Sequence, residues 1–150
     1  MEWIETMKFI VVIFASLFSF VPFAFSQTIE IKKRQQAMQV VKEQIGTMAP
    51  MAFGKAEYDD FLAITALEDL LAAVQSYKEL FELPPTEDDK TDASPEIWLN
   101  KSDFEKKSDK FVSDILMAIE SEPDDSAEFR EYFGKITSNC KSCHQAYRIK

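Results

Sequence analysis

The two cysteines and the single histidine of this chain lie within five consecutive positions near its C-terminus. Cys140, Cys143 and His144 form the pattern C-x-x-C-H in a sequence of 150 residues. On a helix, side chains three residues apart face the same side, so two thiols at this spacing can form thioethers with the two vinyl groups of a haem. The imidazole that follows can bind the iron. The motif therefore predicts haem attachment through Cys140 and Cys143, with His144 as the axial iron ligand.

Other chemistries of the same residues fit the sequence less well. A thioredoxin-like C-x-x-C site needs a strand–helix–strand setting, and no useful length of the chain alternates with a period of two. A zinc site needs a fourth ligand, which no further cysteine or histidine supplies. A disulfide between Cys140 and Cys143 would leave His144 without a role. If the motif binds haem, the sixth iron position must hold Met, Lys, water or nothing.

An apolar N-terminal segment predicts export from the cytoplasm. Lys8 precedes the apolar run 9–25, which ends in small residues. This pattern is typical of a secretory signal peptide, which we assign to residues 1–26. An uncleaved anchor is the alternative, although the run contains a proline and is short for spanning a bilayer. We expect translation to start at Met7 rather than Met1, because the residues between them include two glutamates.

One acidic domain follows the predicted signal peptide. Residues 27–150 suffice for a single core and are too few for two. The whole sequence has 26 acidic and 17 basic residues, a net charge of −9. Such a chain repels nucleic acid and anionic lipid, so we expect neither nucleic acid nor, after signal cleavage, a membrane among its partners.

Apolar residues recur at helical spacing in four segments of the domain. The segments are residues 29–51, 58–83, 101–120 and 126–149. Ser102 and Glu105 stand in the register of a capping box at the start of the third segment. A loop rich in Pro, Asp and Thr precedes that segment and contains a short turn at residues 96–99. Four helices with one long connection predict an all-α fold, an antiparallel up-down four-helix bundle.

This topology predicts which side chains of the first helix face the C-x-x-C-H motif. An antiparallel fourth helix brings the chain end beside the start of the first, where Met38 and His144 lie at similar levels. A porphyrin between the two helices would have His144 on one face and Met38 near the other. Arg34 interrupts the apolar stripe one turn before Met38, and it could pair with a haem propionate.

Four stretches of the sequence together resemble a known family. They are "KRQQAM" at 33–38, "GTMAPM" at 46–51, "PEIW" at 95–98 and "CKSCHQAYRIK" at 140–150. In order and spacing, across nearly all of residues 27–150, they resemble cytochrome c′. The resemblance implies a periplasmic four-helix bundle with one covalent haem c per chain, usually a homodimer packed through its first two helices.

The resemblance also implies a role for each matching residue. Cys140 and Cys143 would carry the thioethers and His144 the axial bond. Arg148 would lie by the proximal imidazole and Arg34 near a propionate. Tyr147 is either a haem neighbour or a packing aromatic. The remaining match, Met38, would close the distal side of the haem as an apolar plug.

Two functions remain open at this stage. In the first, the iron is five-coordinate and high-spin, and the apolar distal side admits nitric oxide or carbon monoxide. In the second, Met38 is the sixth ligand of a low-spin electron carrier that serves a redox partner protein, as in low-spin relatives of the family. We expect no enzymatic activity, because no proton-transfer group is identifiable opposite His144.

Overall fold

The computed structural model describes residues 23–86 and 89–149. Its elements are α2 (Phe23–Ala52), α3 (Asp60–Val74), the 3₁₀ helix η1 (Tyr77–Phe81), α4 (Glu96–Leu99), α5 (Lys101–Ser121) and α6 (Ser126–Tyr147). The described residues form no strand, and their only isolated bridge joins Ala93 to Arg148. The predicted all-α fold is confirmed, and the predicted turn at residues 96–99 is α4.

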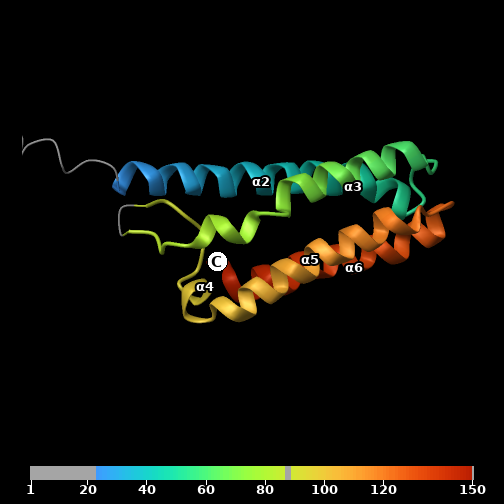
Figure 1. Cartoon of the computed structure of the whole chain (residues 1–150). Helices are drawn as coiled ribbons and strands as arrows, with labels where there is room; N and C mark the ends of the chain where they lie inside the picture. Colours follow the sequence, from blue (N-terminus) through green and yellow to red (C-terminus); the bar gives the residue numbers. More distant parts are fainter. Residues whose placement is uncertain (1–22, 87–88, 150) are drawn as a thin grey trace, which may run out of the picture.

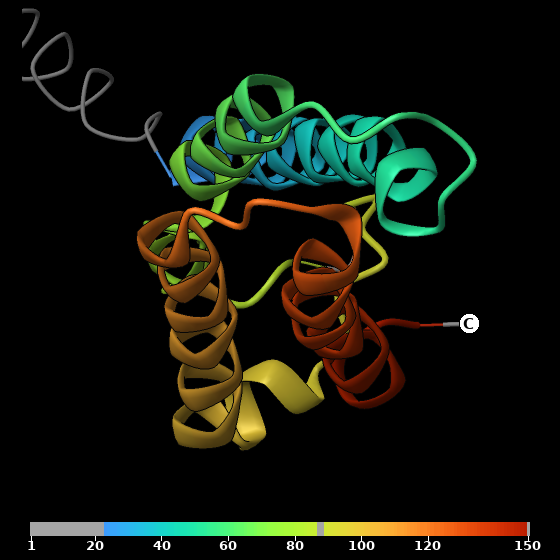
Figure 2. The ribbon, with the colours of Figure 1, turned by 90° about the vertical axis from the view of Figure 1, so that its right-hand side faces the viewer.

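The four long helices form two antiparallel hairpins. Helix α2 packs along α3, α5 packs along α6, and the hairpins meet through α3 with α5 and α2 with α6. The ribbons show the α2–α3 hairpin lying against the α5–α6 hairpin (Figures 1 and 2). The end of α6 therefore lies on the same side of the bundle as η1 and α4 (Figure 1). This is the up-down four-helix bundle that the sequence predicts.

Both candidate start residues, Met1 and Met7, and most of the predicted signal peptide lie outside the described residues. The described chain begins at Phe23, inside the predicted signal peptide of residues 1–26. Within residues 23–86 and 89–149, none of the helices has the length and apolar character needed to cross a membrane.

Two clusters of buried side chains hold the bundle together. The main core joins all four long helices, and each large side chain fully buried there contributes about 1.5–3 kcal/mol to folding. Its largest fully buried members are Phe129, Met48, Leu67, Leu70, Ile115 and Ile136. A second cluster, the end cluster, lies beside the end of α6. It consists of Phe81, Ile97, Phe104 and Tyr147.

The second predicted helix is shorter than its apolar pattern indicates. A single helix over residues 58–83 is wrong, because α3 ends at Val74 and η1 follows after a break. Ser76 has φ −111° and ψ 15°, outside the helical region. The break turns the chain so that Phe81 reaches the end cluster and the Leu80 carbonyl points to α2. Packing overrides the local helical pattern here.

The predicted capping box at the start of α5 is also wrong. Asn100 is the N-cap residue, and its side chain makes no capping hydrogen bond. Instead Asn100 Nδ2 donates to Glu96 Oε2 at 2.7 Å. Because α4 runs directly into α5, Ser102 lies inside the helix and the first turn is fastened to α4.

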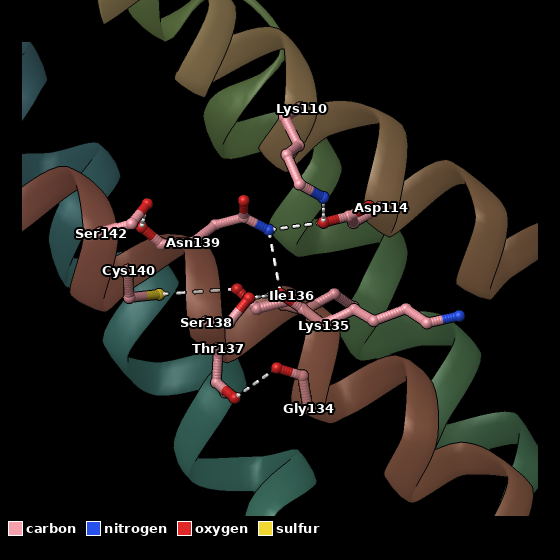
Figure 3. A network of polar contacts seen from close by, with 10 residues as sticks. All are labelled: Lys110, Asp114, Gly134, Lys135, Ile136, Thr137, Ser138, Asn139, Cys140 and Ser142. Atoms are coloured by element: carbon pink, nitrogen blue, oxygen red, sulfur yellow. Dashed lines mark hydrogen bonds and ion pairs between the residues drawn. The ribbon is translucent and has the colours of Figure 1, made fainter.

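A buried polar contact joins α5 to α6 one residue before Cys140 (Figure 3). Asn139 Nδ2 donates to Asp114 Oδ2 at 2.7 Å, and Lys110 Nζ donates to the same oxygen at 2.7 Å. Asp114 is 3% exposed and Asn139 6%. Burial raises the pKa of Asp114, but the hydrogen bonds from Lys110 and Asn139 outweigh it and leave the pKa below its ordinary value. The contact fixes the last turns of α6 against α5.

Removing this carboxylate should weaken the fold. We expect Asp114→Ala to lower the free energy of unfolding by about 1–3 kcal/mol at neutral pH, because the buried Asn139 amide would lose its bond to Asp114 and keep only the one to the Lys135 carbonyl. Denaturant unfolding measures the effect. The control is Asp109→Ala, which removes an exposed ion pair with Lys78 and should change stability little. Equal losses in both variants would contradict a special role for the buried contact.

The same carboxylate should make stability depend on pH. A depressed folded-state pKa stabilises the protein above the unfolded pKa, and this contribution disappears as pH falls through the folded pKa. We therefore expect the stability difference between wild type and Asp114→Asn to hold from neutral pH to about 5 and to shrink below about 4. A difference that stays constant down to about pH 2 would refute this assignment.

Candidate haem-binding site

Helix α6 presents the C-x-x-C-H motif in its last two turns. The helix begins where the Asp125 side chain accepts hydrogen bonds from two backbone N–H groups of its first turn. Cys140 and Cys143 are free, half-buried thiols, and His144 is exposed. Burial raises the pKa of both thiols, although the nearby charge of Lys107 partly offsets this at Cys143. A redox-active C-x-x-C site needs a lowered thiol pKa, so these thiols do not fit that alternative.

The imidazole of His144 is in the protonation state that a metal ligand needs. Desolvation lowers its pKa, and the positive charge of Arg148 lowers it further. The ring is therefore neutral at neutral pH and has a nitrogen lone pair to offer.

Arg34 of α2 lies inside the bundle beside η1. It is 5% exposed, and its Nε donates to the Leu80 carbonyl oxygen at 2.7 Å. Nη2 donates to the same oxygen. The guanidinium lies over the Phe81 ring, 4.1 Å from the centroid, and 5.8 Å from that of Trp98. Burial lowers the pKa of Arg34, but an arginine in a protein keeps its charge.

One donor of this buried guanidinium is unused. Arg34 Nη1 is buried and has no hydrogen-bond partner, and none of the ion pairs among the described residues involves Arg34. A buried donor without an acceptor costs about 1–3 kcal/mol, and more when it is charged. The site therefore calls for an anionic acceptor that the described residues do not provide. A haem carboxylate has the matching charge and geometry.

The structure brings Arg34 and Cys143 to the same place. Cys143 packs against the end cluster. The Arg34 guanidinium lies over the ring of Phe81, which belongs to that cluster. These two residues come from α2 and α6, which pack together. The unpaired donor of Arg34 and the Cys143 thiol, with His144 next to it in the sequence, thus lie at one end of the bundle. This donor set fits a c-type haem.

Tyr147 belongs to the end cluster and ties α6 to α5. Its ring meets that of Phe104 edge-on at 5.4 Å, and its hydroxyl donates to Asp103 Oδ2 at 2.6 Å. Burial and this hydrogen bond raise the pKa of Tyr147 to about 12. A packing role is thus visible for Tyr147, while its predicted place beside the haem stays a prediction.

Arg148 lies outside the end cluster, on the loop side of α6. Its Nη2 lies 2.8 Å from Asp92 Oδ2, and both side chains are exposed. The backbone adds two bonds, from Ile149 N to the Asp92 carbonyl and from Ser94 N to the Tyr147 carbonyl. The loop before α4 therefore holds the chain end beside His144, and the predicted proximal role of Arg148 stays a prediction.

Met38 lies on α2 one turn beyond Arg34, and it is half-buried. It packs against the main core rather than the end cluster. Its side chain therefore faces the interior of the bundle, as the helical pattern predicts. Its predicted role as a distal plug stays a prediction.

The sequence does not predict the contacts of several residues in this region. Tyr77, Leu80 and Phe81 come to Arg34 only because the chain breaks after α3, and no glycine or proline marks that break. Asp92 lies in a loop of many acidic residues, and nothing in the sequence singles it out as the partner of Arg148. Trp98 donates through Nε1 to the Phe81 carbonyl at 3.0 Å and so fastens α4 to η1.

The known proteins similar to this chain include cytochromes c′ and cytochromes c-556. A family model described as Cytochrome C′ matches residues 30–148. Cytochrome c′ of Alcaligenes xylosoxydans xylosoxydans is 32% identical over 121 residues, which cover 80% of this chain and 93% of that protein. Cytochrome c-556 of Agrobacterium tumefaciens (strain II Chrys) is 28% identical over 121 residues, covering 81% and 98%.

Solved structures agree with these matches. A nitric oxide complex of a variant of cytochrome c prime from Alcaligenes xylosoxidans superposes with a TM-score of 0.70 and 30% identity, covering 81% of this chain and 94% of that chain. Cytochrome c prime from Shewanella frigidimarina has a TM-score of 0.75 and 24% identity, covering 83% and 97%, and supports the fold alone. Because the family model spans most of the sequence, this chain belongs to the cytochrome c′ family, whose members carry a covalently bound c-type haem.

Proposed function

We propose that this chain is a periplasmic haem protein that reversibly binds small diatomic gases, nitric oxide in particular. The observation that carries the proposal is the buried Arg34 guanidinium, whose unused Nη1 lies at the same end of the bundle as Cys143. A similar protein, 30% identical, has been solved as a nitric oxide complex. Protection from nitric oxide would follow from binding it.

In this proposal each of four residues has a separate role in binding the haem. Cys140 and Cys143 would form the thioethers, and His144 would bind the iron through an imidazole nitrogen. Arg34 pairs through Nη1 with a propionate. Bound in this way, the haem supplies an iron with one open position for a ligand. An apolar pocket at the open iron position would favour neutral ligands over water and anions.

Met38 distinguishes this function from a second candidate. As a plug it only packs, and the open position stays available to small gases. As a ligand its thioether would fill that position and raise the reduction potential, which suits electron transfer to a redox partner protein. The half-buried, interior position of Met38 is compatible with this second candidate. We favour the plug, which is the usual arrangement of the family.

The location and assembly belong to the same proposal. We infer that residues 1–26 are removed as a signal peptide and that residues 27–150 form the periplasmic bundle. A homodimer through α2 and α3 is supported by apolar side chains that these helices expose. They are Ile29, Phe61 and Leu62. We infer no enzymatic role, because the chain has no second histidine to move a proton opposite His144.

Loss of both thioethers should abolish covalent haem attachment. We expect wild type, produced with the haem-attachment machinery, to keep its pigment in acidified acetone and to show a c-type chromophore in alkaline pyridine. Cys140→Ala with Cys143→Ala should release the pigment, because no covalent bond remains. Ser142→Ala, between the two cysteines, is the matched control and should retain it. Extractable pigment in wild type would contradict the attachment.

The spin state should report the role of Met38. We expect purified ferric and ferrous protein to have five-coordinate, high-spin optical spectra, and Met38→Ala to leave the spin state unchanged. The second candidate instead requires a low-spin spectrum with a methionine-to-iron charge-transfer band that disappears in Met38→Ala. Observation of that band would replace gas binding with electron transfer as the function.

The charge of Arg34 should raise the reduction potential of the haem iron. We expect Arg34→Met to lower the reduction potential by a few tens of millivolts, because the loss of a buried positive charge favours the ferric state. Redox titration measures the change. Arg130→Met is a matched control, since Arg130 Nε also donates to a backbone carbonyl, that of Ala52. Equal shifts in both variants would contradict a direct pairing of Arg34 with the haem.

A further inference from the structure

The loop before α4 is joined to the end of α6 by its backbone and by one side chain. Ile149 N donates to the Asp92 carbonyl oxygen at 2.8 Å. Ser94 N donates to the Tyr147 carbonyl oxygen at 3.0 Å, which makes a short antiparallel bridge. In addition, Arg148 Nη2 lies 2.8 Å from Asp92 Oδ2. Asp92 therefore contacts the chain end twice, through its carbonyl oxygen and through its carboxylate.

Arg148 lies at the end of the helical turn that contains His144. It is the C-cap residue of α6, and its backbone N–H donates to the His144 carbonyl oxygen at 3.2 Å. An arginine side chain in a protein keeps its positive charge. Burial, and then the charge of Arg148, lowers the pKa of His144, which agrees with the short separation of the two residues along the helix. The position of this guanidinium therefore matters to whatever His144 binds.

The ion pair of Asp92 with Arg148 has little to add to the stability of the fold. Both side chains are exposed, and exposed ion pairs contribute little to stability. The backbone bonds of Asp92 and Ser94 already join the loop to the chain end. Among residues 23–86 and 89–149, Asp92 is the one ion-pair partner of Arg148. The carboxylate therefore restricts the position of a long, flexible cation and partly neutralises its charge.

We propose that Asp92 is a positioning residue for Arg148, whose guanidinium it holds beside the last turn of α6, and that it thereby limits the effect of this charge on the haem iron. A positive charge near the iron favours the ferrous state and raises the reduction potential. The inference rests on the part of the proposed function that makes His144 the axial ligand. It does not depend on gas binding.

A double-mutant cycle on the reduction potential tests this positioning. The four haem-loaded proteins are wild type, Asp92→Ala, Arg148→Met and the double variant. Asp92→Ala removes the carboxylate and keeps the backbone carbonyl that accepts from Ile149. We expect it to raise the potential of wild type, because the Arg148 charge is then neither held nor neutralised. In the Arg148→Met background we expect a smaller rise, because only one exposed charge, screened by solvent, is lost.

Additivity in this cycle distinguishes positioning from the separate effects of two charges. If Arg148 keeps the same place without Asp92, each charge acts on the iron independently. Asp92→Ala then shifts the reduction potential equally in both backgrounds. A larger shift in the wild-type background supports the positioning role, and an equal or smaller shift overturns it.

Thr91→Ala is the matched control in the same loop. It removes Thr91 Oγ1, which accepts from Ala93 N at 3.1 Å, and it changes no charge. We expect it to leave the reduction potential unchanged. A shift as large as that of Asp92→Ala would show that any disturbance of the loop suffices, and it would overturn the role of the Asp92 carboxylate.

The outcomes separate this inference from the proposed function. If haem-loaded wild type binds no carbon monoxide, gas binding fails, and the cycle still decides the role of Asp92. If wild type binds carbon monoxide and the shifts are equal in the two backgrounds, the role of Asp92 is overturned and gas binding stands. If the purified protein carries no covalent haem, both fail.

Discussion

The interior of this protein contains a positive charge with one hydrogen-bond donor that has no acceptor, and the proposed site depends on this donor. The Arg34 guanidinium satisfies two of its nitrogens at the Leu80 carbonyl and leaves Nη1 buried without an acceptor. A protein of marginal stability does not keep such a group in its interior without compensation. The compensation that fits is a ligand carboxylate, and the free thiols and imidazole of α6 supply the other attachment points for that ligand.

The irregular segment between α3 and α5 makes this arrangement possible. Had α3 continued as one helix, the Leu80 carbonyl would point along the helix axis and Phe81 could not lie under Arg34. The short η1, fastened by the Trp98 indole, instead brings the Leu80 carbonyl and the Phe81 ring to Arg34 of α2. On the other side, Asp114 and Asn139 fix the turn before Cys140. The regular helices thus supply the core, Arg34 and the C-x-x-C-H motif, and the irregular segment supplies the contacts that hold Arg34.

Sequence patterns predict the regular part of this structure and the covalent motif. The C-x-x-C-H spacing carries its chemistry in three residues, and helical periodicity over four segments indicates the bundle. The end of α3 could not be predicted, because residues 75–83 keep a helical pattern and contain no helix breaker. Long-range packing of Phe81 decides their conformation. The Arg148–Asp92 pair could not be predicted for the same reason, since a tertiary contact joins residues that are 56 positions apart in the sequence.

The crystal structure of the haem-loaded protein tests the central claim most directly. We predict continuous density from both cysteine sulfurs to a porphyrin, and Arg34 Nη1 within about 3 Å of a haem carboxylate oxygen. An Arg34 whose Nη1 meets a protein acceptor, or points to solvent away from the haem, would contradict it.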